Sequence, residues 1–235
     1  MIKKASSALG LFLVLAFAPA RAAERPIVVE LFTSEGCSSC PPADALLAEL
    51  AARPGILALS FHVDYWDRLG WKDPFSSSSA TARQQQYAKF LGIDGVYTPQ
   101  IVIDGRWQAV GSDRGEVERA LAAARRAPAS AQLVLSVDHG RARVALGAGA
   151  EDARGSVLLI GFDRRHVDKV ERGENEGRSL SHVDVVRGFA EIGRLDGETR
   201  SIEATVPWHA ERLAAIIHDA DGHVLGAAVA DPGSS

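Results

Sequence analysis

Two cysteines three positions apart, Cys37 and Cys40, are the only cysteines in the chain. A strand-length apolar run, 28–32, precedes them, and apolar residues at helical spacing within 46–50 follow. A cysteine ahead of a helix lies at the positive end of the helix dipole, which favours the thiolate that attacks disulfides. We therefore predict that Cys37 is the nucleophile of a disulfide-exchange pair and that Cys40 resolves the mixed disulfide.

A Cys-x-x-Cys pair also occurs in inert structural disulfides and in metal sites. No second cysteine pair exists to supply a structural disulfide elsewhere in the chain. Two thiolates together with the imidazole of His62 would form a soft-ligand set of the kind that selects copper(I). Both interpretations stay open beside the exchange pair, which needs no cofactor beyond its own dithiol.

The first 22 residues have the organisation of a secretory signal peptide. Lys3 and Lys4 precede an apolar segment, 8–18, and Ala20-Arg21-Ala22 forms a small-residue cleavage site. An uncleaved anchor is the alternative, although the apolar segment is short for one. We expect a periplasmic or secreted protein, where a disulfide persists, with no membrane attachment after cleavage.

The charge balance excludes whole classes of partner. The chain has 26 Lys and Arg against 30 Asp and Glu, and cleavage removes Lys3, Lys4 and Arg21, which leaves 23 basic residues and a net charge of −7. Such an acidic protein is a poor ligand for nucleic acid or for an anionic membrane. The 213 residues after cleavage suffice for one large domain or two small ones.

A second apolar run, 56–63, predicts a strand buried on both faces, as in a parallel sheet. Strand, helix and strand in this length form a βαβ unit, whose parallel strands end at the same edge. His62 and Asp64 are therefore expected near the loop that carries Cys37.

The segment 64–75 has neither helical nor strand periodicity, yet it holds two tryptophans, a tyrosine and three carboxylates. One interpretation is a loop that walls the redox site and contacts a substrate chain through Trp66, Trp71 and Asp64. The other is a hydrophobic cluster that holds down a long loop.

A helix is predicted over about 80–91, two strand-like runs meet at Asp104-Gly105, and a helix follows to about residue 126. Taken with Cys-x-x-Cys after the first strand and Thr98-Pro99 before the third, this order resembles thioredoxin over 27–127. The resemblance implies that Thr98-Pro99, with Tyr97 beside it, lies next to the cysteines and docks an extended substrate backbone. It also implies a cis bond before the proline.

Three stretches carry a closer resemblance: Phe-Thr-Ser-Glu-Gly-Cys-Ser-Ser-Cys-Pro-Pro-Ala-Asp at 32–44, the tryptophan-rich segment, and Tyr-Thr-Pro-Gln at 97–100. They resemble an uncharacterised family of secreted proteins, domain-of-unknown-function family 1223. This resemblance implies a thioredoxin-like domain and export, and it implies no activity.

Two positions depart from thioredoxin. Ser38-Ser39 replaces the Gly-Pro between the cysteines, which leaves the redox direction open because these residues tune thiolate stability. Thioredoxin has a buried acid six residues ahead of its first cysteine, whereas Glu30 lies seven ahead of Cys37. Buried beside the pair, Glu30 would relay a proton; exposed, it would simply face solvent or pair with a basic residue.

After Pro128 the pattern changes to short alternating runs separated by turns, which predicts an antiparallel β-sandwich over 128–235. Within it, the polar segment 171–182 is interpreted as a solvated loop, with an element that covers the redox site or binds a partner as the alternative. Single histidines without ligand spacing are expected to be surface or hydrogen-bonded residues: His139, His166, His209, His218 and His223.

The sequence thus predicts a signal peptide at 1–22, an α/β thioredoxin-like domain at 23–127 and an all-β domain at 128–235. The predicted function is thiol–disulfide exchange on exported proteins, with Cys37, Cys40 and Thr98-Pro99 at the site and an electron partner of unknown kind. A non-catalytic binding module with a structural disulfide and a copper carrier remain alternatives.

Overall fold

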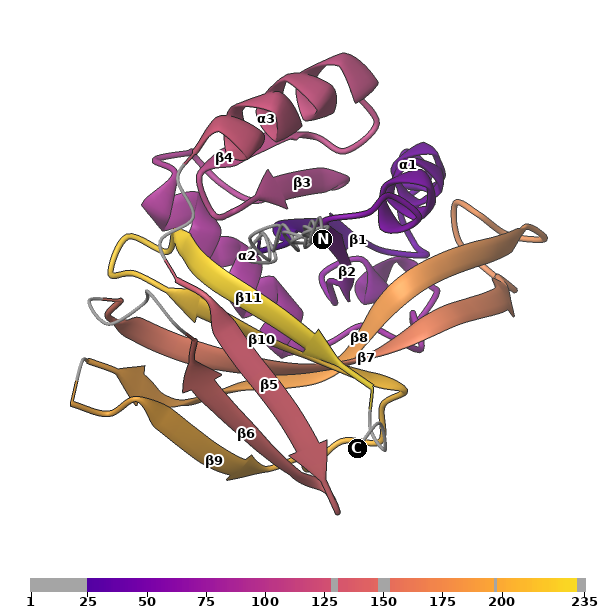
Figure 1. The fold of residues 1–235 in the computed structure, drawn as a ribbon. Coiled ribbons are helices and arrows are strands. Elements are labelled where there is room, and N and C mark those ends of the chain that lie inside the picture. Colours follow the sequence, from indigo (N-terminus) through magenta and orange to yellow (C-terminus); the bar gives the residue numbers. More distant parts are fainter. Residues whose placement is uncertain (1–24, 128–130, 148–152, 197, 232–235) are drawn as a thin grey trace, which may run out of the picture.

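A computed structural model describes residues 25–127, 131–147, 153–196 and 198–231. The expected signal peptide and the expected boundary at Pro128 lie outside these described residues. The elements follow one another in this order (Figure 1): β1 (Ile27–Thr33), α1 (Pro41–Ala51), β2 (Ile56–His62), η1 (Asp67–Leu69), α2 (Ser78–Phe90), β3 (Gln100–Ile103), β4 (Trp107–Val110), α3 (Arg114–Arg126), β5 (Leu133–Asp138), β6 (Arg141–Leu146), β7 (Gly155–Lys169), β8 (Ser179–Leu195), β9 (Ser201–Thr205), β10 (Arg212–His218) and β11 (Val224–Ala230).

One eight-stranded sheet runs through both halves of the chain, in the order β11-β10-β7-β8-β2-β1-β3-β4. β1 and β2 are parallel, with Thr33 opposite His62, so the predicted βαβ unit is present. β8 joins β2 in parallel through a single pair, Ser60 with Val185. That pair makes the C-terminal strands an extension of the thioredoxin-like sheet.

The helices begin where the sequence supplies capping residues. The side chain of Ser77 accepts a hydrogen bond from the N–H of Ala80 at the start of α2, and Asp113 accepts one from Glu116 at the start of α3. Both helices agree with the predicted ranges within two residues. α1 begins with two prolines, which need no N–H partner in a first turn.

The two faces of the sheet carry different helices (Figure 1). Leu31 of β1 packs with Leu47 of α1 and Leu121 of α3 on one face. On the other face, Phe32 packs with Tyr87 of α2 in a cluster that continues into the C-terminal strands. Side chains of β1 therefore alternate between the α1 face and the α2 face, as a strand requires.

The predicted all-β domain is wrong in one respect. The C-terminal half does not form a sheet system of its own, because β7, β8, β10 and β11 belong to the large sheet. A small antiparallel sheet, β5-β6-β9, packs against these strands through residues such as Val144, Val157 and Ile217, which gives sandwich-like packing there. The result is a mixed α/β fold that is consistent with a thioredoxin-like fold.

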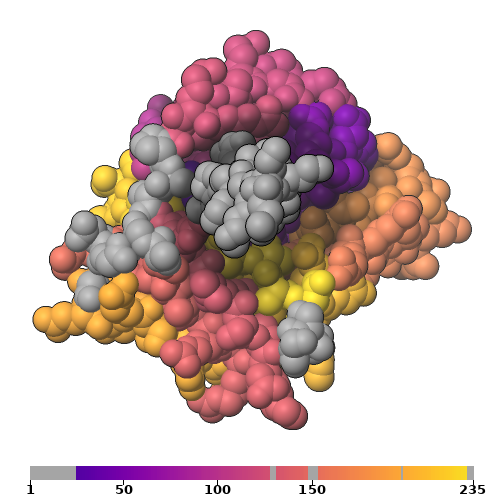
Figure 2. Space-filling view, viewed as in Figure 1, coloured from indigo at the N-terminus to yellow at the C-terminus, as the bar shows by residue number. Residues whose placement is uncertain are grey.

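β7 and β8 form a long hairpin whose far end lies beside α1 (Figures 1 and 2). The predicted strands 157–162 and 183–189 are the inner parts of this hairpin, which the structure extends to 155–169 and 179–195. Across the described ranges, no helix has the length and apolar character needed to cross a membrane.

The turn between β3 and β4 contacts the turn before β11. A substitution at this contact tests how much it contributes to the stability of the fold. The N–H of Val224 donates to the carbonyl of Asp104, and a Cβ on Gly105 would lie 2.0 Å from the carbonyl oxygen of Gly222. We predict that Gly105→Ala lowers the free energy of unfolding well beyond the roughly 1–2 kcal/mol that a left-handed alanine costs.

The matched control is Gly140→Ala, because Gly140 also has a positive φ but faces open space. Urea unfolding of both variants measures the difference. Equal losses would contradict a close joint between the β3–β4 turn and the C-terminal half.

Candidate functional site

Cys37 and Cys40 form a disulfide in the loop between β1 and α1. Cys40 is the N-cap residue of α1, and the N–H groups of Ala43 and Asp44 both donate to its carbonyl. Pro41 and Pro42 have no N–H, so the first two residues of α1 cannot donate a backbone hydrogen bond to a thiolate. The helix dipole still acts on Cys37. The Cys37 Sγ lies 3.3 Å from the Ser39 hydroxyl, which can stabilise a thiolate there.

Trp66 joins the cysteine loop to the Thr98-Pro99 segment. Its Cβ lies 3.0 Å from the position of a Cβ on Gly36, and its indole N–H donates to the Thr98 hydroxyl at 2.8 Å. The Thr98–Pro99 bond is cis. A Cβ on Gly111 would lie 2.9 Å from the Cβ of Ala43 and 3.2 Å from that of Pro99, which places Pro99 beside the first turn of α1.

Below this loop lies a buried cluster of ionisable side chains centred on Glu35. One carboxylate oxygen of Glu35 accepts the indole N–H of Trp71 at 2.8 Å, and the other lies 3.3 Å from the Nε2 of His182. The Nδ1 of His182 lies 3.8 Å from Asp44, an ion-pair distance that is too long for a hydrogen bond. Trp71 and His182 thus bring the tryptophan-rich loop and the C-terminal strand β8 to the same carboxylate.

His62 and Asp73 form a second buried pair in the same cluster. The His62 Nδ1 lies 2.7 Å from an Asp73 carboxylate oxygen, which also accepts the N–H of Glu35 at 2.8 Å. The rings of His62 and His182 contact each other with centroids 4.7 Å apart. Five ionisable side chains are therefore packed where hydrophobic residues would ordinarily fill the space.

The charges of this cluster shift its pKa values. Burial alone would lower the pKa of His182, but the carboxylates of Asp44 and Glu35 outweigh it and raise the pKa to about 10. Burial would raise the pKa of Asp73, but the charge and hydrogen bond of His62 and two backbone N–H donors lower it. At neutral pH His182 is therefore an imidazolium, and Asp44, which faces it, lies one helical turn after Cys40.

The turn of the β7–β8 hairpin, residues 170–178, covers the cysteine loop. The side-chain amide of Asn175 donates to the carbonyls of Glu35 and Cys37 at 2.8 and 2.9 Å, and Asn175 is fully buried. A Glu174 carboxylate oxygen accepts the N–H of Ser38 at 3.0 Å. Most of segment 171–182 is exposed, as the interpretation as a solvated loop expects, but Asn175, Leu180 and His182 are buried and the turn lies over the cysteine loop, as the alternative expects.

Other predicted site residues lie elsewhere. Asp64 accepts a hydrogen bond from the Thr81 hydroxyl and holds the start of α2. The Tyr97 hydroxyl donates to Gln108. His62 is buried near the site, but it pairs with Asp73. Among the described residues, no group of potential metal ligands contains His62 together with Cys37 and Cys40.

Glu30 is buried, but the structure does not bring it to the cysteines. Leu31 of β1 faces α1, so its neighbour Glu30 faces α2, where it accepts hydrogen bonds from Arg83 and from the Tyr87 hydroxyl. Its predicted role as a proton relay beside the pair fails for this reason of strand alternation.

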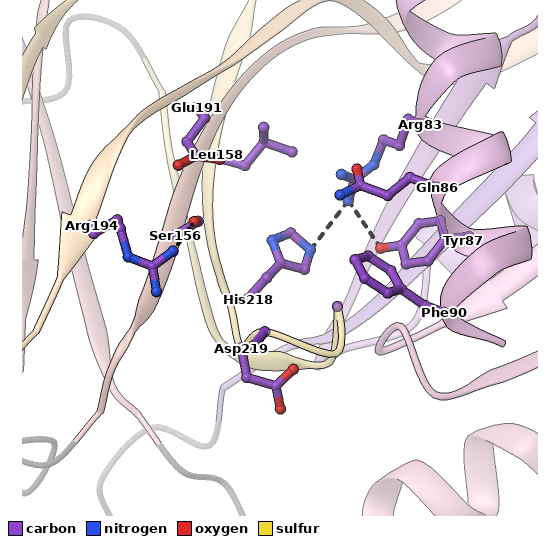
Figure 3. Close-up of a pocket in the computed structure, with 12 residues that line it drawn as sticks. Arg83, Gln86, Tyr87, Phe90, Ser156, Leu158, Glu191, Arg194, His218 and Asp219 are labelled. Carbon is purple, nitrogen blue, oxygen red and sulfur yellow. Dashed lines mark hydrogen bonds between the residues drawn. The ribbon is translucent and has the colours of Figure 1, made fainter.

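Arg83 also borders a separate cavity of about 200 Å³ between α2 and the C-terminal strands (Figure 3). Its Nη2 lies 3.2 Å from the Nε2 of His218. Burial first, and then the charge of Arg83, lower the pKa of His218 well below its ordinary value, so this imidazole is neutral. The cavity lies on the α2 face of the sheet, opposite the face that α1 covers.

Comparison with known proteins identifies the family. The model of a protein family of unknown function, DUF1223, matches residues 28–219. The chain belongs to the DUF1223 family. The sequence resemblance to that family is thereby confirmed.

Two solved structures resemble this DUF1223 chain. Protein AGR_C_4864 from Agrobacterium tumefaciens is 30% identical, with a TM-score of 0.76 over 91% of this chain and 98% of that one. HBP35 of Porphyromonas gingivalis is 13% identical, with a TM-score of 0.57 over 90% of this chain and 78% of that one, and it supports the fold alone. The comparison with curated proteins found no match.

Sequence reasoning missed six residues of the site in this DUF1223 chain: Glu35, Asp44, Asp73, Glu174, Asn175 and His182. Glu35 and Asp44 had a detectable signal, since one lies two residues before Cys37 and the other one turn after Cys40. Glu174 and His182 had no local signal, because only the pairing of β8 with β2 brings their hairpin to the cysteine loop.

The raised pKa of His182 predicts a pH-dependent contribution to stability. His182 is charged in the folded protein up to about pH 10, whereas an unfolded histidine is charged only up to about pH 6.5. Its contribution is therefore fully present below about pH 6.5 and is lost as the pH rises towards 10, at about 1.4 kcal/mol for each pKa unit of difference at most.

We expect His182→Gln to lower the free energy of unfolding more at pH 6.5 than near pH 10. Urea unfolding of the oxidised wild type and variant across this range measures the difference, with His139→Gln as an exposed-histidine control. A penalty that stays constant with pH would contradict the charged state of His182.

Proposed function

We propose that this protein catalyses thiol–disulfide exchange at Cys37 and Cys40. The observation that carries the proposal is the buried cluster of Glu35, Asp44 and His182 beside the disulfide loop. Burying charges is costly, and a disulfide that only holds a loop needs none of them. Ionisable groups with shifted pKa values gather at catalytic sites, where thiolate and proton must both be managed.

In the exchange step, a substrate thiolate attacks the Sγ of Cys37. The new sulfur–sulfur bond forms as the Cys37–Cys40 bond breaks, and Cys40 leaves as a thiolate that takes up a proton. A second substrate thiolate then attacks the substrate sulfur of the mixed disulfide and releases Cys37. The substrate loses two electrons and two protons to the cysteine pair, and the reverse sequence reduces a substrate disulfide.

The cluster supports particular roles for its members. The imidazolium of His182, held by Glu35 and Asp44, offsets part of the negative charge that these two side chains bring to the region of the cysteine loop. Asp44 lies one helical turn after Cys40, and its N–H donates to the carbonyl of Cys40, so the Asp44–His182 pair is joined to the turn that carries the resolving cysteine. Trp66 and Thr98 form the adjacent wall, which suits contact with a substrate chain.

The substrates proposed are exported proteins with thiols or disulfides, together with an electron partner of the same chemistry. The signal-like residues 1–22 and the pair of cysteines support a periplasmic or secreted location, where such substrates occur.

A second candidate function is a binding module whose disulfide is structural. The complete burial of Cys37 and Cys40 favours it, because a nucleophile must be reached by its substrate. The two functions differ in whether the pair forms a mixed disulfide with another protein.

We predict that Cys40→Ser, once reduced, forms a stable mixed disulfide with a protein disulfide substrate such as oxidised, unfolded ribonuclease. With the resolving thiol removed, the bond at Cys37 persists. Non-reducing electrophoresis and mass spectrometry detect the adduct and locate it.

The matched control is Cys37→Ser, which leaves Cys40 as the only thiol and is expected to form at least about tenfold less adduct. Equal trapping by both variants would contradict the assignment of the nucleophile. No adduct with either variant would favour the binding module with a structural disulfide.

A further inference from the structure

The cysteine pair is closed off by a part of the same chain that lies far away in sequence. Both cysteines have an exposed fraction of 0%, although they lie in a loop at the edge of the sheet. The hairpin turn 170–178 lies against this loop, through Asn175 and Glu174. Any thiol that reacts with Cys37 must therefore meet a site that is already occupied.

The turn contacts the cysteine loop through hydrogen bonds to the backbone of that loop. The Asn175 amide donates to the carbonyls on either side of Gly36, and Glu174 accepts the N–H of the residue directly after Cys37. These three bonds occupy backbone groups on both sides of the nucleophile, within reach of any polypeptide that approaches Cys37. The turn and a polypeptide substrate would compete for them.

The turn is built to present these two side chains. Arg178 donates to the Oδ1 of Asn175 at 2.8 Å, which orients the amide. Backbone hydrogen bonds between Val170 and Arg178 and between Gly177 and Val170 close the turn. Trp71, which donates to Glu35, packs its Cβ near Gly173 on the other side.

Among the described residues, no other strand of the large sheet pairs with the outer hairpin, although His182 near its base is buried beside Glu35 and Asp44. β10 pairs with β7 only as far as Phe162, and β2 pairs with β8 only at Val185. Beyond these positions β7 and β8 pair only with each other, and a register shift at Gly161/Phe162 and a positive φ at Asp184 mark where this two-stranded arm begins. The turn itself is held to the cysteine loop by a few hydrogen bonds, one of them to the exposed Glu174.

We propose that residues 170–178 are a gate over the Cys37–Cys40 disulfide and that a substrate reacts only after displacing this turn. The proposal deepens the exchange function, because it makes the partner a polypeptide that outcompetes Asn175 and Glu174 for the backbone groups beside Cys37. A thiol that meets the closed gate reacts slowly, which protects the pair from unselective reduction.

The test is the rate at which dithiothreitol reduces the disulfide of the purified, full-length protein. One thiolate of the reagent attacks Cys37 and displaces Cys40, and its second thiolate releases Cys37, so the reagent becomes a cyclic disulfide and the protein gains two electrons and two protons. With a gate, the rate rises linearly at low reagent concentration and levels off at the opening rate when attack outpaces closing.

We expect Asn175→Ala to raise the low-concentration rate by about tenfold or more, because it removes two hydrogen bonds that each stabilise the closed turn. Glu174→Ala removes one bond and is expected to raise the rate by about threefold. The matched control, Glu176→Ala, removes the same charge from an exposed neighbour in the same turn and is expected to leave the rate unchanged.

Alkylation of the reduced proteins by iodoacetamide provides a second readout, with the same order of rates expected. Urea unfolding shows whether each variant is folded, and Glu174→Ala, an exposed position, keeps the test valid if Asn175→Ala is too unstable. Wild-type rates in the folded Asn175 and Glu174 variants, or a threefold rise in Glu176→Ala, would overturn the gate. Faster variants that never exchange with a protein disulfide would support the gate and overturn the exchange function.

Discussion

The site depends on the interactions of the buried Glu35 carboxylate. It accepts a hydrogen bond from Trp71 of the tryptophan-rich loop and pairs with His182 of β8, while its N–H and carbonyl are held by Asp73 and Asn175. A carboxylate in this position is costly unless it is fully paired, so these contacts have to form together. Since Glu35 lies two residues before Cys37, the same contacts determine the conformation of the cysteine loop.

This dependence explains why the C-terminal half is part of the site and not an appendage. The single parallel pair of Ser60 with Val185 attaches β8 to the thioredoxin-like sheet, and His182 lies three residues before Val185. This pairing places His182 beside Glu35 and Asp44, and it places the hairpin turn 170–178 against the cysteine loop. A thioredoxin-like half alone would leave Glu35 and Asp44 without their cation.

The sequence predicted the parts of the structure that local patterns encode. The cysteine pair after β1, the helix that follows it, and the extents of α2 and α3 all follow from residue type and spacing. The position of Pro99 beside α1 followed from a family resemblance. These features involve residues that are close in sequence or belong to a recognisable motif.

The rest depended on long-range pairing. Glu30 was expected beside the cysteines, but only the register of β1 decides that it faces α2 and not α1. Segment 171–182 is polar and glycine-rich, and nothing in that composition shows that Asn175 is buried against Cys37. An all-β domain was expected because an alternating pattern predicts strands but not their neighbours. The same pattern is found whether the strands form a separate sheet or extend another one.

The central claim is that the charged cluster serves a redox-active pair, and the reduction potential of Cys37–Cys40 tests it most directly. The protein would be equilibrated with glutathione redox buffers, and its free thiols trapped and counted by mass spectrometry. The hydroxyl of Ser39 and the N-terminus of α1 favour the thiolate form, so the account predicts a midpoint potential above about −300 mV. A potential below about −300 mV, the range of structural disulfides, would contradict it.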